Sequence, residues 1–225
     1  MSIKATIIKF LEFTRFKRSY AQDGEDVVLS SFYDGKKRYK GFFIDVGAHH
    51  PVRFSNTWYF YKKGWKGINI DPTPGSMRSF KLLRSRDTNL ELGVGQEESM
   101  MLFYCFNEPA LNTFDAELAA QRNTGKPYKI SKKITVPILP LSLILDRHLP
   151  ADQHIDFFTI DVEGLDLVVL KSNDWQKYRP DFLLVEDNHF NFEELKNSEM
   201  FQFLNSVGYE IKAVLQRTII YRKRY

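Results

Sequence analysis

Short apolar runs alternate along the chain with longer segments in which apolar and polar residues are mixed. An apolar run of about four to eight residues that stops at a turn residue is typical of a buried strand. Five such runs are predicted strands, at residues 41–47, 65–72, 88–95, 154–164 and 181–190. Segments typical of helices lie between them, at residues 55–64, 74–86, 165–175 and 191–208. Ser55 is a suitable N-cap for the first helix, which Gly64 would end.

This alternation predicts an α/β fold with a mainly parallel, doubly wound sheet, whose ligands bind at the carboxyl ends of the strands. Residues 99–106 are expected to pair beside the third strand, and residues 134–148 to form a short strand and a helix start. Residues 107–133 are polar and irregular, which is typical of a lid or a substrate loop. Residues 209–224 predict two strands around a turn, hence a C-terminal antiparallel hairpin.

Composition supports one ordinary globular domain over residues 1–225, since 43% of the residues are hydrophobic and 27% are charged. The net charge of +4 is mild, and its basic clusters lie at the two ends of the chain. No nucleic-acid-binding module surrounds them, so we expect no nucleic-acid partner. The single cysteine, Cys105, excludes an intrachain disulfide and favours a reducing, cytoplasmic setting.

The N-terminal segment mixes basic and apolar residues at a rough helical spacing. It has neither the apolar core nor the cleavage site of a signal peptide, and no apolar run of the chain reaches the ~18 residues of a membrane span. We favour a helical segment, residues 1–40, that packs on the domain. The alternative is a peripheral contact with a membrane surface.

The first strand-helix-strand unit carries the pattern of a nucleoside-binding site. Asp45 and Gly47 follow the first strand, and Gly47 would let the backbone approach a ligand closely. Asp71 ends the second strand, where an acid can accept both hydroxyls of a ribose. Only one glycine is present and Pro51 lies in the turn, whereas a pyrophosphate needs more free amides. The pattern indicates a cofactor without a pyrophosphate, such as S-adenosylmethionine, or else a purely structural unit.

His49 and His50 lie in the same turn. Adjacent side chains of an extended segment point to opposite faces, which disfavours a shared metal ion. We therefore favour an interpretation in which the two histidines shape the turn and form local hydrogen bonds.

Acidic residues also end the fourth and fifth predicted strands. Asp161 and Glu163 lie two positions apart, and Glu186 and Asp187 end the neighbouring strand. Four carboxylates at one edge of a sheet repel each other unless a cation or a proton lies among them. Mg²⁺ would suit these oxygen ligands, and a carboxylate off the metal, or His189, could act as a general base. The alternative is that some of the four cap helices or pair with Lys or Arg.

Five motifs, in this order, make the sequence similar to a known family. They are SYAQDGEDVVL, FFIDVGAHHPVRFSNT, GINIDPTPGS, TIDVEGLDLVVL and LLVED, and they run from Ser19 to Asp187. The set resembles the FkbM family of S-adenosylmethionine-dependent O-methyltransferases, whose members are associated with methylation of sugars in polysaccharides and of natural products. The resemblance implies a Rossmann-like class I methyltransferase fold.

The resemblance also implies roles for individual residues. The cofactor-binding residues that it implies are Gln22, Glu25, Asp45, Gly47, Ala48, Ser55, Asn56 and Asp71. We add His49 and Pro72 to the predicted cofactor site because they lie beside these residues in the sequence. Asp71 would hold the ribose, and the N-terminal motif around Gln22 would fold over the same site. The catalytic residues would be Glu163, Asp161 and His189, with Glu163 as the base. By analogy with related sugar O-methyltransferases, Asp161, Glu186 and Asp187 would bind Mg²⁺.

The turn GAHHPVRF departs from the commoner pattern of the family, so the roles of His49 and His50 do not follow from the resemblance. The expected function is methylation of a hydroxyl on a sugar or polysaccharide acceptor in the cytoplasm. Two other functions stay open: a non-catalytic Rossmann-like binding domain, and an NAD-dependent sugar-modifying enzyme. The missing glycines argue against NAD.

Overall fold

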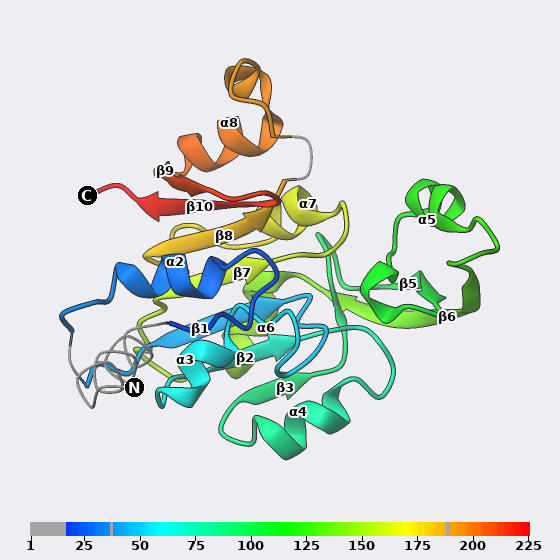
Figure 1. Ribbon diagram of the computed structural model, residues 1–225, viewed down its shortest axis with the longest axis horizontal. Coiled ribbons are helices and arrows are strands. Elements are labelled where there is room, and N and C mark those ends of the chain that lie inside the picture. The colour runs from blue at the N-terminus through cyan, green and yellow to red at the C-terminus, as the bar shows by residue number, and fades with distance from the viewer. Residues whose placement is uncertain (1–16, 37, 188–189) are drawn as a thin grey trace, which may run out of the picture.

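The computed structural model describes residues 17–36, 38–187 and 190–225, so residues 1–16 and 37 of the predicted N-terminal helical segment lie outside the described residues. Its main sheet has seven strands in the order β3-β2-β1-β7-β8-β10-β9 (Figure 1). The bounds are β1 (Phe42–Val46), β2 (Lys66–Ile70), β3 (Thr88–Leu90), β7 (Phe157–Ile160), β8 (Phe182–Glu186), β9 (Tyr209–Val214) and β10 (Thr218–Lys223). The first five are parallel, and β10 is antiparallel to both of its neighbours. The predicted mainly parallel, doubly wound α/β sheet with a C-terminal antiparallel hairpin is confirmed.

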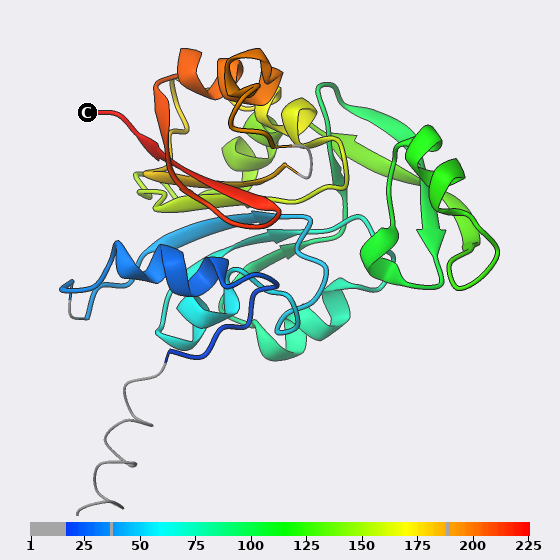
Figure 2. The same cartoon turned by 45° about the horizontal axis from the view of Figure 1, so that its top comes forward.

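Helices cover both faces of this sheet (Figure 2). The helices are α2 (Glu25–Ser31), α3 (Trp58–Lys62), α4 (Met77–Leu83), α6 (Leu141–His148), α7 (Asp166–Lys171), α8 (Glu199–Ser206) and the short η2 (Leu195–Asn197). Side chains of α6, α7 and α8 share a core with Ile44 and Phe158. Side chains of α2 and α3 share a core on the other face with Phe43 and Phe157. Successive side chains of a buried strand thus pack into the cores on opposite faces of the sheet, and both must be apolar. This explains why these strands appear in the sequence as continuous apolar runs.

A second sheet forms an arm beside the carboxyl ends of the parallel strands (Figure 1). It contains β4 (Gly93–Val94), β5 (Ser99–Phe106) and β6 (Ile130–Leu139), in the order β4-β6-β5. The arm also carries η1 (Pro109–Leu111) and α5 (Ala116–Arg122), which is capped by the Asp115 carboxylate.

The arm corrects three predictions. The predicted strand 88–95 is wrong as a single strand, because β3 belongs to the main sheet and β4 to the second. Residues 99–106 pair with β6 and not with the third strand. Residues 107–133 are not simply irregular, since they include α5 and the start of β6. The reason is that much of the β5–β6 ribbon is exposed, and an exposed ribbon needs no continuous apolar run.

No helix in the described part of the chain is long and apolar enough to span a bilayer.

A buried polar network fixes the half of the sheet formed by β1, β2 and β3. At its centre lies Arg84, which is 0% exposed and forms an ion pair of 2.9 Å with the equally buried Asp87. Its guanidinium also donates hydrogen bonds to the backbone carbonyl of Pro51 at 3.2 Å, the Thr57 hydroxyl at 3.2 Å and the side-chain amide oxygen of Asn69 at 3.4 Å. The buried Arg84 cation is tolerated because nearly every N–H donor of its guanidinium has an acceptor.

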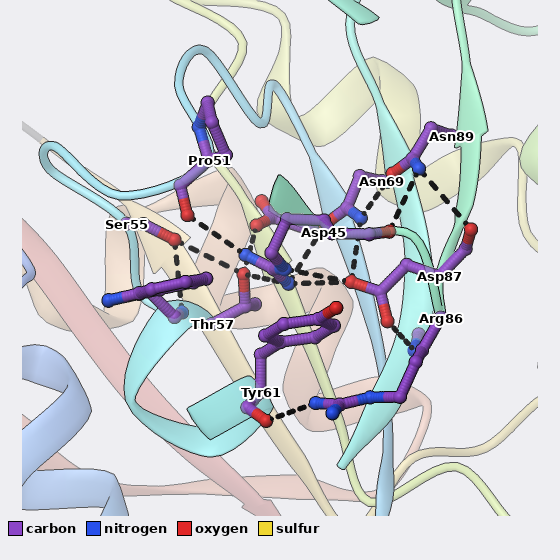
Figure 3. Close-up of polar contacts among 12 residues, drawn as sticks. Asp45, Pro51, Ser55, Thr57, Tyr61, Asn69, Arg86, Asp87 and Asn89 are labelled. Atoms are coloured by element: carbon purple, nitrogen blue, oxygen red, sulfur yellow. Dashed lines mark hydrogen bonds and ion pairs between the residues drawn. The ribbon is translucent and has the colours of Figure 1, made fainter. Parts of the chain in front are cut away.

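The same network reaches the strands directly (Figure 3). The Thr57 hydroxyl donates to the Asp45 carboxylate of β1 at 2.7 Å. Asn69 of β2 donates to Asn89 of β3 at 2.8 Å and to Asp87 at 3.1 Å. The turn that follows β1 is thereby tied to all three strands.

We expect R84M to lose about 3–5 kcal/mol of unfolding free energy, because it leaves the Asp87 carboxylate buried without a cation. Urea denaturation followed by circular dichroism measures the loss. K81M, on the exposed side of α4, is the matched control and should change stability by less than about 0.5 kcal/mol. Equal stabilities of the two variants would contradict the role assigned to Arg84.

Candidate active site

A cavity lies at the carboxyl ends of β1, β2 and β7, beside the arm. Seven of the predicted site residues line it: Gln22, Gly47, His49, Asp71, Pro72, Asp161 and Glu163. They come from segments that are far apart in sequence, and the parallel sheet brings them to one edge.

The other predicted cofactor residues support the walls of this cavity without lining it. Ala48 donates its backbone N–H to the Ile70 carbonyl at 3.1 Å. The Ser55 hydroxyl accepts the Trp58 N–H at 3.1 Å at the start of α3, and Asn56 donates to the Thr159 hydroxyl at 2.9 Å.

Asp45 and Glu25 are buried beside the cavity. Burial raises the pKa of Asp45 to about 6, against the opposing effects of the Thr57 hydroxyl and the Arg84 guanidinium. Glu25 accepts the hydroxyl of Thr218 at 3.1 Å, which joins the N-terminal motif to the C-terminal hairpin. Asp45 and Glu25 therefore stabilise the protein around the cavity and do not line the cavity themselves.

Gly47 is required sterically at the end of β1. Its φ is +84°, and a Cβ there would lie 1.7 Å from the carbonyl oxygen of Asp161. Its N–H donates to the Ile70 carbonyl at 2.9 Å. The loops after β1 and β7 can therefore approach each other only through a residue without a side chain.

Asp71 faces the cavity with a carboxylate that is oriented but not saturated. Its two oxygens accept the N–H groups of His49 at 3.0 Å and Thr73 at 2.8 Å. An ionised carboxylate has about four acceptor sites, so one site remains on each oxygen. Two free acceptor sites fit a pair of ribose hydroxyls.

The two histidines shape the turn, as predicted. The His50 ring Nδ1 accepts the N–H groups of Val52 at 3.1 Å and Arg53 at 2.9 Å. His49 has a φ of +48°, and burial lowers the pKa of its imidazole. His49 nevertheless lines the cavity, so a neutral ring is available to a ligand there.

Four carboxylates gather at the carboxyl ends of β7 and β8: Asp161, Glu163, Asp166 and Glu186. Asp161 lines the cavity and keeps accessible surface there. Desolvation by the surrounding protein, together with the nearby Glu186, raises the pKa of Asp161 well above the usual range. Asp166, which the sequence analysis missed, is buried at the start of α7, and burial and Glu186 raise its pKa to about 8. At neutral pH the cluster therefore holds protons.

The predicted Mg²⁺ ligands do not form a ready site. Within the described ranges, one group of three His, Cys, Asp or Glu residues has its ligand atoms within 4.8 Å of one another, and it lies elsewhere. Asp161, Glu186 and Asp187 do not meet that condition, so Mg²⁺ binding stays a prediction. The alternative base, His189, lies outside the described residues.

Glu163 is paired with a residue that the sequence analysis did not find. Arg122, from α5 of the arm, donates to its carboxylate at 2.5 Å. Glu163 has a φ of +56°, a conformation that costs free energy in a residue with a side chain, and the Thr113 hydroxyl donates to its carbonyl at 3.2 Å. Burial raises the pKa of Glu163 and Arg122 opposes that rise.

The arm closes one side of the cavity. Pro109, Asn112 and Phe114 line it, and the Asn112 amide donates to the Thr73 hydroxyl at 3.0 Å. Arg53 and Glu108 form a second link of 3.2 Å. The sequence predicts that residues 107–133 cover the substrate. The first part of this segment does lie at one side of the cavity.

The lining of the cavity fits the parts of S-adenosylmethionine. Leu92, Val94 and Phe103 form an apolar side that suits a planar base, and Asp71 offers acceptors for a ribose. No Lys or Arg of the described chain lines the cavity, which disfavours a pyrophosphate.

Comparisons with known proteins give two findings. A family model described as a methyltransferase FkbM domain matches residues 45–211, which is most of the chain. A solved structure, precorrin-6y C5,15-methyltransferase from Geobacter metallireducens GS-15, is similar with 12% identity, 88% of each chain covered and a TM-score of 0.41. No curated protein gives a significant match.

G47A should lose about 3 kcal/mol or more of unfolding free energy in urea, because it combines backbone strain with a collision against Asp161. G125A is the matched control: its φ of +83° imposes the same strain of about 1–2 kcal/mol, but nothing lies within 4 Å of the added methyl group. Equal losses in the two variants would show that the approach to Asp161 is not tight.

R122Q should raise the pKa of Glu163 further, because it removes the cation that stabilises the charged carboxylate. A carbon-13 NMR titration of the glutamate carboxyls measures the change, and R53Q, which pairs with Glu108, is the control. The folded pKa then lies further above the usual 4.5, so R122Q loses additional stability as pH rises through that folded pKa. An unchanged pKa would mean that the ion pair is absent in solution.

Proposed function

The chain belongs to the FkbM methyltransferase family, and we propose that it transfers the methyl group of S-adenosylmethionine to a hydroxyl of a sugar. The observation that carries the proposal is the cavity in which Gly47, Asp71 and Glu163 meet. It joins a nucleoside-type lining to a carboxylate that can accept a proton.

Asp71 would hold the ribose and Gly47 would allow close approach of the methionine side. The N-terminal motif contributes Gln22 to the same lining. When bound, S-adenosylmethionine supplies a methyl group that is already activated on a sulfonium. The protein therefore has mainly to align the hydroxyl with that methyl group.

Glu163 is the best candidate for the base. Its carboxylate lines the cavity, and the burial that raises its pKa makes it a better proton acceptor once it is ionised. Arg122 favours the ionised form of this carboxylate. Asp161, beside Glu186, would then serve to position the hydroxyl.

The acceptor proposal rests on the family and on the polar edge of the cavity. Asn112 and Thr113, from the arm, line the cavity and suit a hydroxylated ligand. We therefore propose a sugar of a polysaccharide or of a glycosylated natural product, methylated in the cytoplasm, where the buried thiol of Cys105 would stay reduced.

The rival functions have less support. An NAD-dependent enzyme would need a cradle for the pyrophosphate, and the described lining offers neither a cation nor a second glycine after β1. A non-catalytic binding domain has no evident use for the positive φ at Glu163 or for its pairing with Arg122.

Calorimetric titration with S-adenosylmethionine tests the proposal. We expect binding to the wild type and a loss of about 10–100-fold in affinity in D71N, since a charged acceptor of two hydroxyls becomes neutral. D152N, at an exposed position at the opposite end of the sheet, is the control and should bind normally.

Two outcomes decide between the functions. No binding at millimolar S-adenosylmethionine would contradict the methyltransferase proposal. Displacement of bound S-adenosylmethionine by NAD would favour the NAD-dependent enzyme. Titration with Mg²⁺, repeated with E186Q, examines the metal prediction separately.

A further inference from the structure

A second cluster of chemically active side chains lies at the amino ends of β7 and β8, at the opposite end of the sheet from the cavity. His154 and Asp156 precede β7, and Asp181 precedes β8. Each offers one ligand atom, and the three atoms lie within 4.8 Å of one another. We propose that these three residues bind one divalent transition-metal ion of the Zn²⁺ type.

The separation of the ligand atoms suits such an ion. The His154 Nε2 and an Asp181 carboxylate oxygen are 3.0 Å apart. Two ligands that share a Zn²⁺ ion at ~2.0–2.2 Å lie about 3.0–3.5 Å from each other. His154 and Asp181 need little movement to accept the ion between them.

Asp156 is held in place by the surrounding backbone. It is 1% exposed, and its two oxygens accept the Phe42 N–H at 2.8 Å and the Tyr39 hydroxyl at 2.7 Å. Gly41 leaves room for it, because a Cβ there would lie 2.3 Å from a carboxylate oxygen. Partners of this kind orient a metal ligand, and each oxygen keeps a free acceptor site.

The cluster carries negative charge with little compensation. In the part of the chain that the structure describes, His154 is the one basic side chain within ion-pair distance of either aspartate. Arg222 stacks on the ring of Phe182, and Lys36 on the rings of Tyr33 and Tyr39. A divalent ion would neutralise the two carboxylates where they stand.

The cluster is also reachable. The side chains of His154 and Asp181 are 53% and 32% exposed. His154 lines a surface cavity together with Asp152 and Gln153, so solvent reaches this side of the cluster. One imidazole and two carboxylates suit Zn²⁺, Co²⁺ or Mn²⁺ better than the soft Cu(I) ion.

Calorimetric titration of the full chain with ZnCl₂ tests the proposal, together with the melting temperature at each metal concentration. We expect one equivalent of Zn²⁺ to bind and to raise the melting temperature by roughly 5–10 °C near saturation. H154Q and D181N, both at partly exposed positions, should weaken binding at least tenfold. D152N, on the same cavity, should bind like the wild type.

Two further variants separate this site from other candidates. H50Q and E186Q alter the histidine turn and the carboxylate cluster at the other end of the sheet, and Zn²⁺ affinity should not change in either. Undiminished binding in H154Q and D181N, or no binding at 1 mM ZnCl₂, would overturn the assignment. The result does not depend on the proposed methyltransferase activity, because no S-adenosylmethionine is present.

Discussion

The buried ion pair between Arg84 and Asp87 is the interaction on which the cofactor half of the molecule depends. An Arg with no exposed surface persists only if its donors are satisfied, and here the acceptors come from β2, the turn after β1 and the segment before β3. Through Thr57 the network also reaches Asp45 on β1. A satisfied buried network of this kind specifies one arrangement of the backbone. It therefore sets where Gly47 and Asp71 emerge at the edge of the sheet.

Close approach of two loops completes the cavity. Gly47 has no side chain, so the loop after β7 can lie against the turn after β1 and present Asp161 and Glu163 to the same space. The arm then supplies Arg122 to Glu163 and Asn112 to the loop after β2. Three constraints (buried charge, close backbone approach and the arm) converge on one site. This convergence explains why residues from both halves of the chain line a single cavity.

The sequence predicted the fold and the residues whose signals are local. Strand ends, the lone glycine and Asp71 are visible because each lies beside an apolar run whose direction is known. The roles of Arg84 and Arg122 were not predicted, because each residue belongs to an ordinary polar helical pattern. Only the tertiary structure shows which carboxylate each arginine pairs with. The arm was misassigned because an exposed two-stranded ribbon lacks the apolar periodicity that marks a buried strand. Asp166 was missed because an acid in the first turn of a helix is normally explained by capping.

The most direct test of the central claim is a crystal structure with bound S-adenosylhomocysteine. The account predicts the ribose hydroxyls on the Asp71 carboxylate, the sulfur near Gly47 and Asp161, and the base on the apolar side formed by Leu92, Val94 and Phe103. A cofactor bound elsewhere, or a ribose beyond hydrogen-bond distance of Asp71, would contradict it.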